Sequence, residues 1–172
     1  MSSARGRRSA GILAWRRRAR RQGGAHAAAD ATDVEVFLVH PGGPFWARRD
    51  AGAWSIPKGE YADEEPALQA AQREFHEETG QHVQGPFIEL APLRQPGGKL
   101  VVAFAVEAPS LDAAKLRSNL FRLEWPPRSG QFREFPEVDR AAWFTLAQAH
   151  TRLLAGQRAL LRELAARLGL AT

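Results

Sequence analysis

Residues 59–81 hold the feature that most restricts how this chain can fold: three glutamates spaced for one face of a helix. The run reads GEYADEEPALQAAQREFHEETGQ. Glu74, Glu77 and Glu78 are spaced i, i+3 and i+4, so a helix brings their carboxylates side by side. Such a helix must present this face to something that tolerates three negative charges, which rules out burying it in an apolar core.

The rest of the run indicates where this helix begins and ends. We predict it over Glu64–Thr79, with Asp63 as its N-cap and Pro66 tolerated in its first turn. Gly80 supplies the residue that ends it. Phe75 lies on the neighbouring face and is expected to pack into the core.

The acidic face needs an explanation, because like charges within one turn repel each other. Hard divalent cations prefer oxygen ligands and resolve that conflict, and Mg²⁺ keeps positions open for water and phosphate. A solvated acidic face would not account for Gly59, Gly80 and Arg73 at their offsets. We expect Arg73 to form a structural ion pair with Glu65 that anchors the loop before the helix.

Composition narrows the remaining possibilities. The chain has 172 residues, 44% of them hydrophobic and 25% charged, which are values for one globular domain over residues 1–172. It contains no cysteine, which excludes disulfide scaffolds, thiolate zinc sites and thiol nucleophiles. No stretch approaches the roughly 18 apolar residues of a membrane-spanning helix. We therefore expect a soluble, cytoplasmic protein with no membrane partner.

The flanking segments indicate a mixed α/β domain, in the order strands, helix, strands, helix. Residues 145–169 carry an apolar stripe at helical spacing, and we predict one helix over Leu146–Leu168. Trp54–Gly59 is a short extended stretch that leads into the acidic run. The predicted strands are Gly11–Trp15, Val34–Val39, Phe87–Leu93, Leu100–Glu107, Leu120–Trp125 and Asp139–Phe144.

The net charge of +5 is concentrated at the amino end, where eight arginines fall within the first 21 residues. They form either a patch for polyanions or a solvated arm. We favour the arm, because no aromatic side chains interleave with them. Residues 1–8 are predicted to be a mobile arm, and residues 16–33 a loose hairpin connection. Ser9–Trp15 is expected to be a core strand that the mature protein keeps.

The acidic run resembles a known family signature. It fits G-x5-E-x7-R-E-U-x-E-E-x-G-U, where U is a bulky apolar residue, and this pattern is the Nudix box. Only Gln81 departs from it, since an apolar residue is usual there; Val83 is expected to cover the same core surface. The resemblance implies a three-layer α/β/α sandwich and a hydrolase acting on nucleoside diphosphates linked to another group. The matching residues are Gly59, Glu65, Arg73, Glu74, Phe75, Glu77, Glu78 and Gly80.

The resemblance also implies how the acidic face is used. Glu74, Glu77 and Glu78 would bind Mg²⁺ or Mn²⁺ together with the backbone carbonyl of Lys58. Bound metal would neutralise the pyrophosphate and lower the pKa of the attacking water. One carboxylate, in the box or in a later loop, would act as general base. Gly59, Glu65, Arg73 and Gly80 would be structural.

A second carboxylate is expected from a late loop. Members of the family often carry a glutamate six residues before a tryptophan that opens a late strand, and Glu137 precedes Trp143 by six residues. We predict that Glu137 is a catalytic residue and metal ligand alongside Glu77 and Glu78. Glu134 is the competing candidate.

The substrate prediction depends on a shorter resemblance. Trp54–Gly59 is similar to the W-x-x-P-K-G entry of asymmetric dinucleoside tetraphosphate hydrolases, so the predicted substrates are dinucleoside polyphosphates. The predicted phosphate-binding cations are Lys58, Lys99 and Arg94. Phe45, Trp46, Trp125, Phe132 and Phe135 are candidates to stack on a base. We prefer Trp46 and Phe132, because both are expected in polar loops flanked by glycine and proline.

Three alternatives stay open. The arginine-rich start would suit removal of pyrophosphate from the 5′ end of RNA, although a nucleic-acid partner is not favoured. A non-catalytic Nudix domain that senses a nucleotide is also conceivable, but such domains typically lose box glutamates that this chain keeps. Oxidised nucleoside triphosphates, ADP-ribose and diphosphoinositol compounds are further possible substrates. The sequence does not indicate the oligomeric state.

Overall fold

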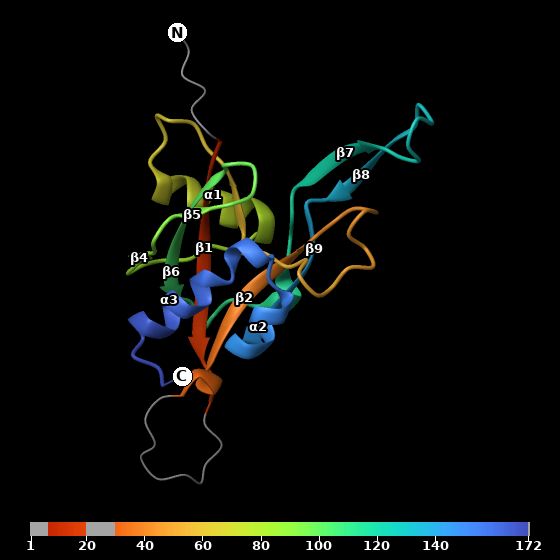
Figure 1. Ribbon diagram of the computed structural model, residues 1–172. Coiled ribbons are helices and arrows are strands. Elements are labelled where there is room, and N and C mark those ends of the chain that lie inside the picture. Colours follow the sequence, from red (N-terminus) through yellow and green to blue (C-terminus); the bar gives the residue numbers. More distant parts are fainter. Residues whose placement is uncertain (1–6, 20–29, 172) are drawn as a thin grey trace.

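A mixed sheet organises the fold, with strand order β4-β6-β1-β2-β9 (Figure 1). The computed structural model describes residues 7–19 and 30–171. β1 runs parallel to β6 and antiparallel to β2, which itself pairs antiparallel with β9. Two short strands extend the sheet, β3 beside β1 and β5 beside β6. The strands are β1 (Arg8–Arg17), β2 (Val34–Pro41), β3 (Lys58–Glu60), β4 (Ile88–Glu89), β5 (Leu93–Arg94), β6 (Leu100–Glu107) and β9 (Val138–Thr145).

Helices cover both faces of this sheet, so the predicted three-layer architecture is confirmed (Figure 1). α1 (Ala67–Thr79) lies on one face, where Phe75 packs among Ile12 and Phe37. α2 (Leu146–Arg152) and α3 (Ala159–Arg167) lie on the other face, over Leu13 and Ile56. Neighbouring residues of β1 therefore enter opposite cores, as the alternation of a strand requires. Short 3₁₀ turns occupy Ala31–Asp33, Ala113–Lys115 and Ala155–Gln157.

The amino-terminal strand β1 lies inside the sheet between β6 and β2. Ile12 and Leu13 are completely buried, which confirms the predicted core strand. The predicted mobile arm is wrong for Arg7 and Arg8, because the carbonyl of Arg7 accepts a hydrogen bond from Leu100 and Arg8 begins β1. The rest of the arm, residues 1–6, lies outside the described residues.

The predicted connection over residues 16–33 is wrong at both described ends. Arg16 and Arg17 still belong to β1 and pair with Glu35 and Val34. Its other end forms the 3₁₀ turn Ala31–Asp33. Residues 20–29 lie outside the described part of the chain. The pairing of β1 with β2 therefore extends two residues beyond Trp15, into arginines whose residue type does not indicate a strand.

Helix α1 begins later than predicted. It starts at Ala67, with Pro66 rather than Asp63 in the N-cap position at φ −60° and ψ 136°. The proline ring disfavours helical backbone in the residue before it, so the helix cannot extend back to Glu64. Gly80 ends the helix as predicted, with a left-handed φ of 74°.

The carboxyl-terminal segment is not one helix. It is broken between α2 and α3, where Leu153 and Leu154 take extended backbone. The N–H of Leu154 donates to the carbonyl of Trp54 at 2.9 Å, so pairing with the entry stretch replaces helical bonding here. Tertiary contact therefore overrides the helical pattern of the tail. No helix within residues 7–19 and 30–171 is both long and apolar enough to cross a bilayer.

Two further predicted elements need correction. The strand predicted over Phe87–Leu93 is two short pieces, β4 and β5, each paired with β6. β7 (Leu120–Glu124) pairs with β8 (Phe132–Pro136) in a hairpin outside the main sheet, which projects from the body (Figure 1). Phe132 therefore lies in a strand opposite Glu124, not in the predicted loop.

Candidate active site

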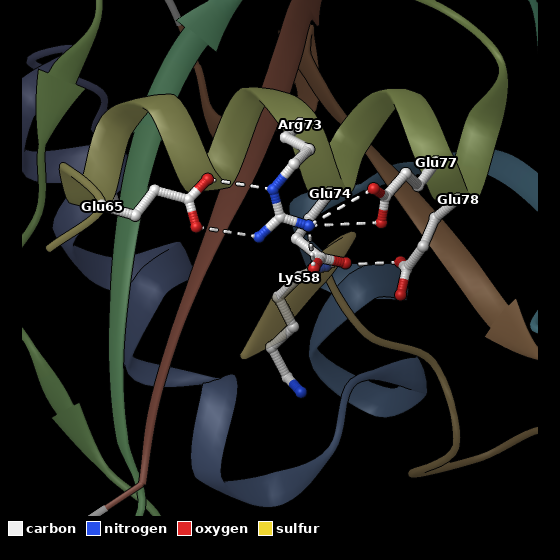
Figure 2. A network of polar contacts seen from close by, with 6 residues as sticks. All are labelled: Lys58, Glu65, Arg73, Glu74, Glu77 and Glu78. Atoms are coloured by element: carbon white, nitrogen blue, oxygen red, sulfur yellow. Dashed lines mark hydrogen bonds and ion pairs between the residues drawn. The ribbon is translucent and has the colours of Figure 1, made fainter. Parts of the chain in front are cut away.

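The three clustered glutamates lie on the last turns of α1, directly above β3 (Figure 2). The backbone N–H of Lys58 donates to Oε2 of Glu78 at 3.3 Å. Gly59 faces Glu74 so closely that a Cβ atom at this position would overlap the carboxylate of Glu74. The glycine at the start of the run is therefore needed for close approach of strand and helix rather than for an unusual backbone angle.

Arg73 pairs with Glu65 as predicted, through two parallel hydrogen bonds from Nε at 2.9 Å and Nη2 at 3.1 Å (Figure 2). Its third nitrogen, Nη1, also reaches the metal-binding candidates, at 2.8 Å from Glu74 and 3.3 Å from Glu77. The two bonds from Arg73 to Glu65 hold the pKa of Glu65 below its ordinary value. Arg73 thus anchors the loop before α1 and partly neutralises the acidic face.

One arginine does not neutralise this group of carboxylates. Burial raises the pKa of Glu78 to about 8, with further contributions from the negative charges of Glu74 and Glu137. Burial also raises the pKa of Glu74 and of Glu137. A carboxylate that resists ionisation at neutral pH, as Glu78 does, indicates excess negative charge in a poorly hydrated place, which a bound cation would relieve.

The donor set suits a hard divalent cation. Four carboxylates provide only oxygen atoms, which Mg²⁺ and Mn²⁺ prefer. Among the described residues, however, no three acidic or imidazole side chains already surround a common cation position. Nη1 of Arg73 lies between Glu74 and Glu77. A cation between these carboxylates would require them to turn away from Nη1, because the planar guanidinium cannot withdraw this nitrogen while Nε and Nη2 stay on Glu65.

A pocket of about 190 Å³ opens beside the acidic face. Lys58 is half-buried in its wall; burial and the nearby charge of Lys99 lower the pKa of its ammonium group. Within the described part of the chain this ammonium has no salt-bridge partner. An unpaired cation in a pocket is suited to an anionic ligand. The lining is Val39, Pro41, Trp46, Ala53, Ser55, Ile56, Lys58, Glu78, Glu137, Val138 and Leu154.

Glu137 comes to this pocket from between β8 and β9. Its backbone N–H donates to the carbonyl of Asn119 at 2.8 Å, and its carbonyl accepts from Gly42 at 2.9 Å. Asn119 in turn donates to the carbonyl of Glu77 at 2.9 Å, so the loop is tied to the end of α1. Glu134 lies instead in β8 opposite Arg122 and does not line the pocket.

The predicted substrate-binding residues divide into two groups. Trp46 and Lys58 line the pocket, and Lys99 lies near it, paired with Glu60 at 3.5 Å. Arg94 is exposed in β5 and Phe132 is exposed in β8, and neither lines the pocket. The structure therefore brings together part of the predicted set only.

Gln157 belongs to the site's framework and is absent from the predictions. Its side chain is completely buried, and Oε1 accepts from the backbone N–H of Ile56 at 3.0 Å while Nε2 donates to Ser55 at 3.0 Å. The spacing of the tail could have identified Gln157, because this residue stands at a position where the apolar stripe requires a hydrophobic side chain. A polar residue at such a position needs a buried partner.

Gln81, the one departure from the box pattern, also has a structural explanation. Its side-chain amide exchanges two hydrogen bonds with the backbone of Asp112, each of 2.9 Å. Val83 is 6% exposed and joins the core beneath α1, as predicted. A polar bridge to the loop after β6 therefore replaces the usual apolar contact.

Comparisons with known proteins agree with this architecture. The family model described as NUDIX domain matches residues 20–164. The structure is similar to an Ap4A hydrolase of C. elegans in a binary complex, with TM-score 0.56 and 19% identity over 95% of this chain and 98% of that one.

Two other solved structures show a similar fold. A mutT/nudix family protein from Listeria innocua has TM-score 0.58 and 16% identity, over 95% of this chain and 94% of the other. The NUDIX domain of Shewanella oneidensis NrtR, solved in complex with ADP ribose, has TM-score 0.57 and 17% identity, over 96% and 90%. At these identities the similarity concerns the fold alone. No curated protein matches the sequence.

Proposed function

This chain belongs to the Nudix family of pyrophosphohydrolases, and we propose that it uses a divalent cation to cleave a phosphoanhydride bond in dinucleoside polyphosphates. The observation that carries the proposal is one pocket that is lined by Lys58 together with Glu78 and Glu137. Excess carboxylate charge suits a metal, and the adjacent unpaired cation suits the phosphate that the metal would also contact.

The metal would be Mg²⁺ or Mn²⁺, held by Glu74, Glu77 and Glu78, with the carbonyl of Lys58 and the carboxylate of Glu137 as further ligands. When bound, it would neutralise the polyphosphate and lower the pKa of the attacking water. Arg73 stays on Glu65 and keeps α1 in register with the loop before it.

The chain's own groups orient the substrate. The Lys58 ammonium binds a phosphate oxygen beside the cleaved bond, and Lys99 adds positive charge nearby. Trp46 stacks against one base at the apolar end of the pocket, where Ile56 and Leu154 exclude water. Glu137 takes the proton of the attacking water as general base.

A substrate panel with Mg²⁺ and Mn²⁺ tests this proposal, with products identified by mass. Formation of ATP and AMP from diadenosine tetraphosphate is the expected result. The panel also contains ADP-ribose, oxidised nucleoside triphosphates, a diphosphoinositol compound and a 5′-triphosphorylated RNA. If the protein binds Mn²⁺ but cleaves none of these compounds, it is a nucleotide sensor rather than an enzyme.

The general base is tested separately by neutralising each candidate carboxylate. We expect Glu137→Gln to lower kcat by roughly 10²- to 10⁴-fold, the usual contribution of general base catalysis. Glu134→Gln is the matched control, since its side chain is exposed in β8 and outside the pocket. Full turnover in Glu137→Gln with loss in Glu134→Gln would reverse the assignment.

The RNA alternative gains no support from the described arginines. Arg16 pairs with Glu35 at 2.7 Å and Arg18 lies 3.5 Å from the same carboxylate, while Arg17 stacks over Trp15. These contacts hold the three side chains against the protein, although Glu35 offsets only one of their positive charges. The RNA arm of the panel, repeated at several salt concentrations, tests this alternative directly.

A further inference from the structure

The hairpin β7-β8 and the loop after β2 expose an unusual amount of apolar surface. The described part of the chain has three large hydrophobic side chains that are more than half exposed: Phe45 at 61%, Leu120 at 57% and Phe132 at 52%. Phe45 lies in the loop, and the other two lie in the hairpin. Concentrated apolar exposure of this kind marks a binding surface, and a free two-stranded hairpin is only marginally stable in water without packing.

The hairpin starts at the active site. Strand β7 follows Asn119, whose backbone N–H donates to the carbonyl of Glu77. Strand β8 ends at Pro136, directly before Glu137. At about 3.3 Å per residue, the six steps from Asn119 to Trp125 reach roughly 20 Å from this root. Figure 1 shows the hairpin projecting on the same side of the body as the loop after β2. A ligand extending out of the site would therefore pass along it.

The two faces of the hairpin differ. Phe121 and Phe135 are opposite each other on one face, and Trp125 continues that face by the alternation of a strand. Gly43 lies against the ring of Phe121, and Phe45 meets Trp125 edge to face at 5.4 Å. The loop therefore lines this inner face, and the next residue after Phe45 is Trp46 of the pocket.

The outer face has other contacts. Arg122 covers the ring of Phe132 at 4.5 Å, and Leu120 lies on the same face. On the inner face, Arg133 is opposite Leu123 and has no acidic partner among the described residues. Exposed aromatic rings with an unpaired cation beside them are the features that bind nucleobases attached to phosphate.

We propose that the inner face of the hairpin and the adjacent loop bind the second nucleoside of a dinucleoside polyphosphate, through Phe45 of the loop and Trp125 and Arg133 of the hairpin. This inference rests on the proposed function, in which Trp46 holds the first base and the acidic face holds the phosphates. The second base stacks on the exposed ring of Phe45, and Arg133 contacts the outer phosphates. The surface thus selects substrates with a base at both ends of the phosphate chain.

The test compares diadenosine tetraphosphate with adenosine 5′-tetraphosphate, which has no second base, using wild type and Phe45→Ala. Loss of one stacking contact should raise KM for the dinucleotide by roughly 10- to 100-fold. The KM for adenosine 5′-tetraphosphate and both kcat values should stay within about 2-fold. Phe45→Tyr should restore the low KM, because it keeps the ring that stacks, and the difference between the two substrates separates this role from a merely structural one. Leu120→Ala is the control on the outer face.

Several results would overturn this assignment while leaving the proposed function intact. Equal effects of Phe45→Ala on both substrates would show that the ring only supports the pocket. A KM effect in Phe132→Ala instead would move the site to the outer face. Inhibition by single-stranded RNA that depends on Phe45, with an unchanged dinucleotide KM, would assign the surface to RNA. Failure of wild type to cleave either nucleotide would instead contradict the proposed function itself.

Discussion

Gln157 allows a quantitative test of how the carboxyl-terminal segment supports the site. Its Oε1 atom accepts from the backbone N–H of Ile56 at 3.0 Å, and the entry stretch continues through Pro57 to Lys58. On its other side the stretch pairs with β2, through the mutual bonds of Val39 and Ser55 of 2.9 and 3.0 Å. Gln157 therefore holds the free side of a segment that forms one wall of the pocket.

The proposed perturbation is Gln157→Leu, which keeps a similar volume and removes both polar groups. The buried N–H of Ile56 then loses its acceptor, at a cost of about 1–3 kcal/mol, and the bond to Ser55 contributes about 1 kcal/mol more. Burial of the apolar leucine side chain offsets about 1 kcal/mol of this cost. We expect a net destabilisation of about 1–3 kcal/mol, or roughly 2–12 °C in Tm for a domain of this size.

Urea and thermal unfolding measure this change, and a double-mutant cycle with Ser55→Ala assigns it. The hydroxyl of Ser55 also donates to the carbonyl of Ile56 at 2.7 Å, so Gln157→Leu leaves that hydroxyl partnered. Ser55→Ala, in contrast, leaves Nε2 of Gln157 without an acceptor. The double variant should therefore lose about 1 kcal/mol less than the sum of the single variants. A Gln157→Leu protein within 0.5 kcal/mol of wild type would refute the reasoning.

Three further predictions concern the site and the sheet. Gly59→Ala should displace the carboxylate of Glu74 and weaken Mn²⁺ binding by at least about 10-fold in calorimetry, while Gly156→Ala, whose Cβ meets only ordinary contacts, should not. In EDTA, ionisation of Glu78 should destabilise the wild type progressively from pH 4.5, its pKa when unfolded, to about pH 8, its pKa when folded. Wild type should therefore lose stability relative to Glu78→Gln over this range in urea unfolding, and a constant difference would contradict the pKa. Deletion of residues 1–17 should abolish cooperative unfolding, because it removes a fully buried central strand; a folded, active truncation would contradict this.

The dual role of Arg73 affects how metal titrations should be interpreted. Its Nη1 atom already occupies the space between Glu74 and Glu77. A cation must displace that contact, so the measured affinity includes the cost of turning the two carboxylates away from Nη1. The two bonds to Glu65 fix the plane of the guanidinium, so the arginine itself stays in place during this exchange.

The sequence by itself determined the elements whose signals are local. The spacing of Glu74, Glu77 and Glu78 predicts a shared helical face, Gly80 predicts the end of α1, and the residues of β6 predict a strand. Each depends on the period of a helix or strand or on the backbone of one residue. The ion pair between Arg73 and Glu65 also follows from positions close together in the chain.

Only the tertiary structure decided the features that join distant segments. Gln157 meets Ile56 across 101 positions. The pairing of Leu154 with Trp54 breaks the tail that its own periodicity predicts to be one helix. The pairing of Phe45 with Trp125 likewise gives the hairpin an inner face, which no local pattern indicates. Such contacts depend on which strands become neighbours, and that is settled by burial summed over the whole sheet rather than by any single segment.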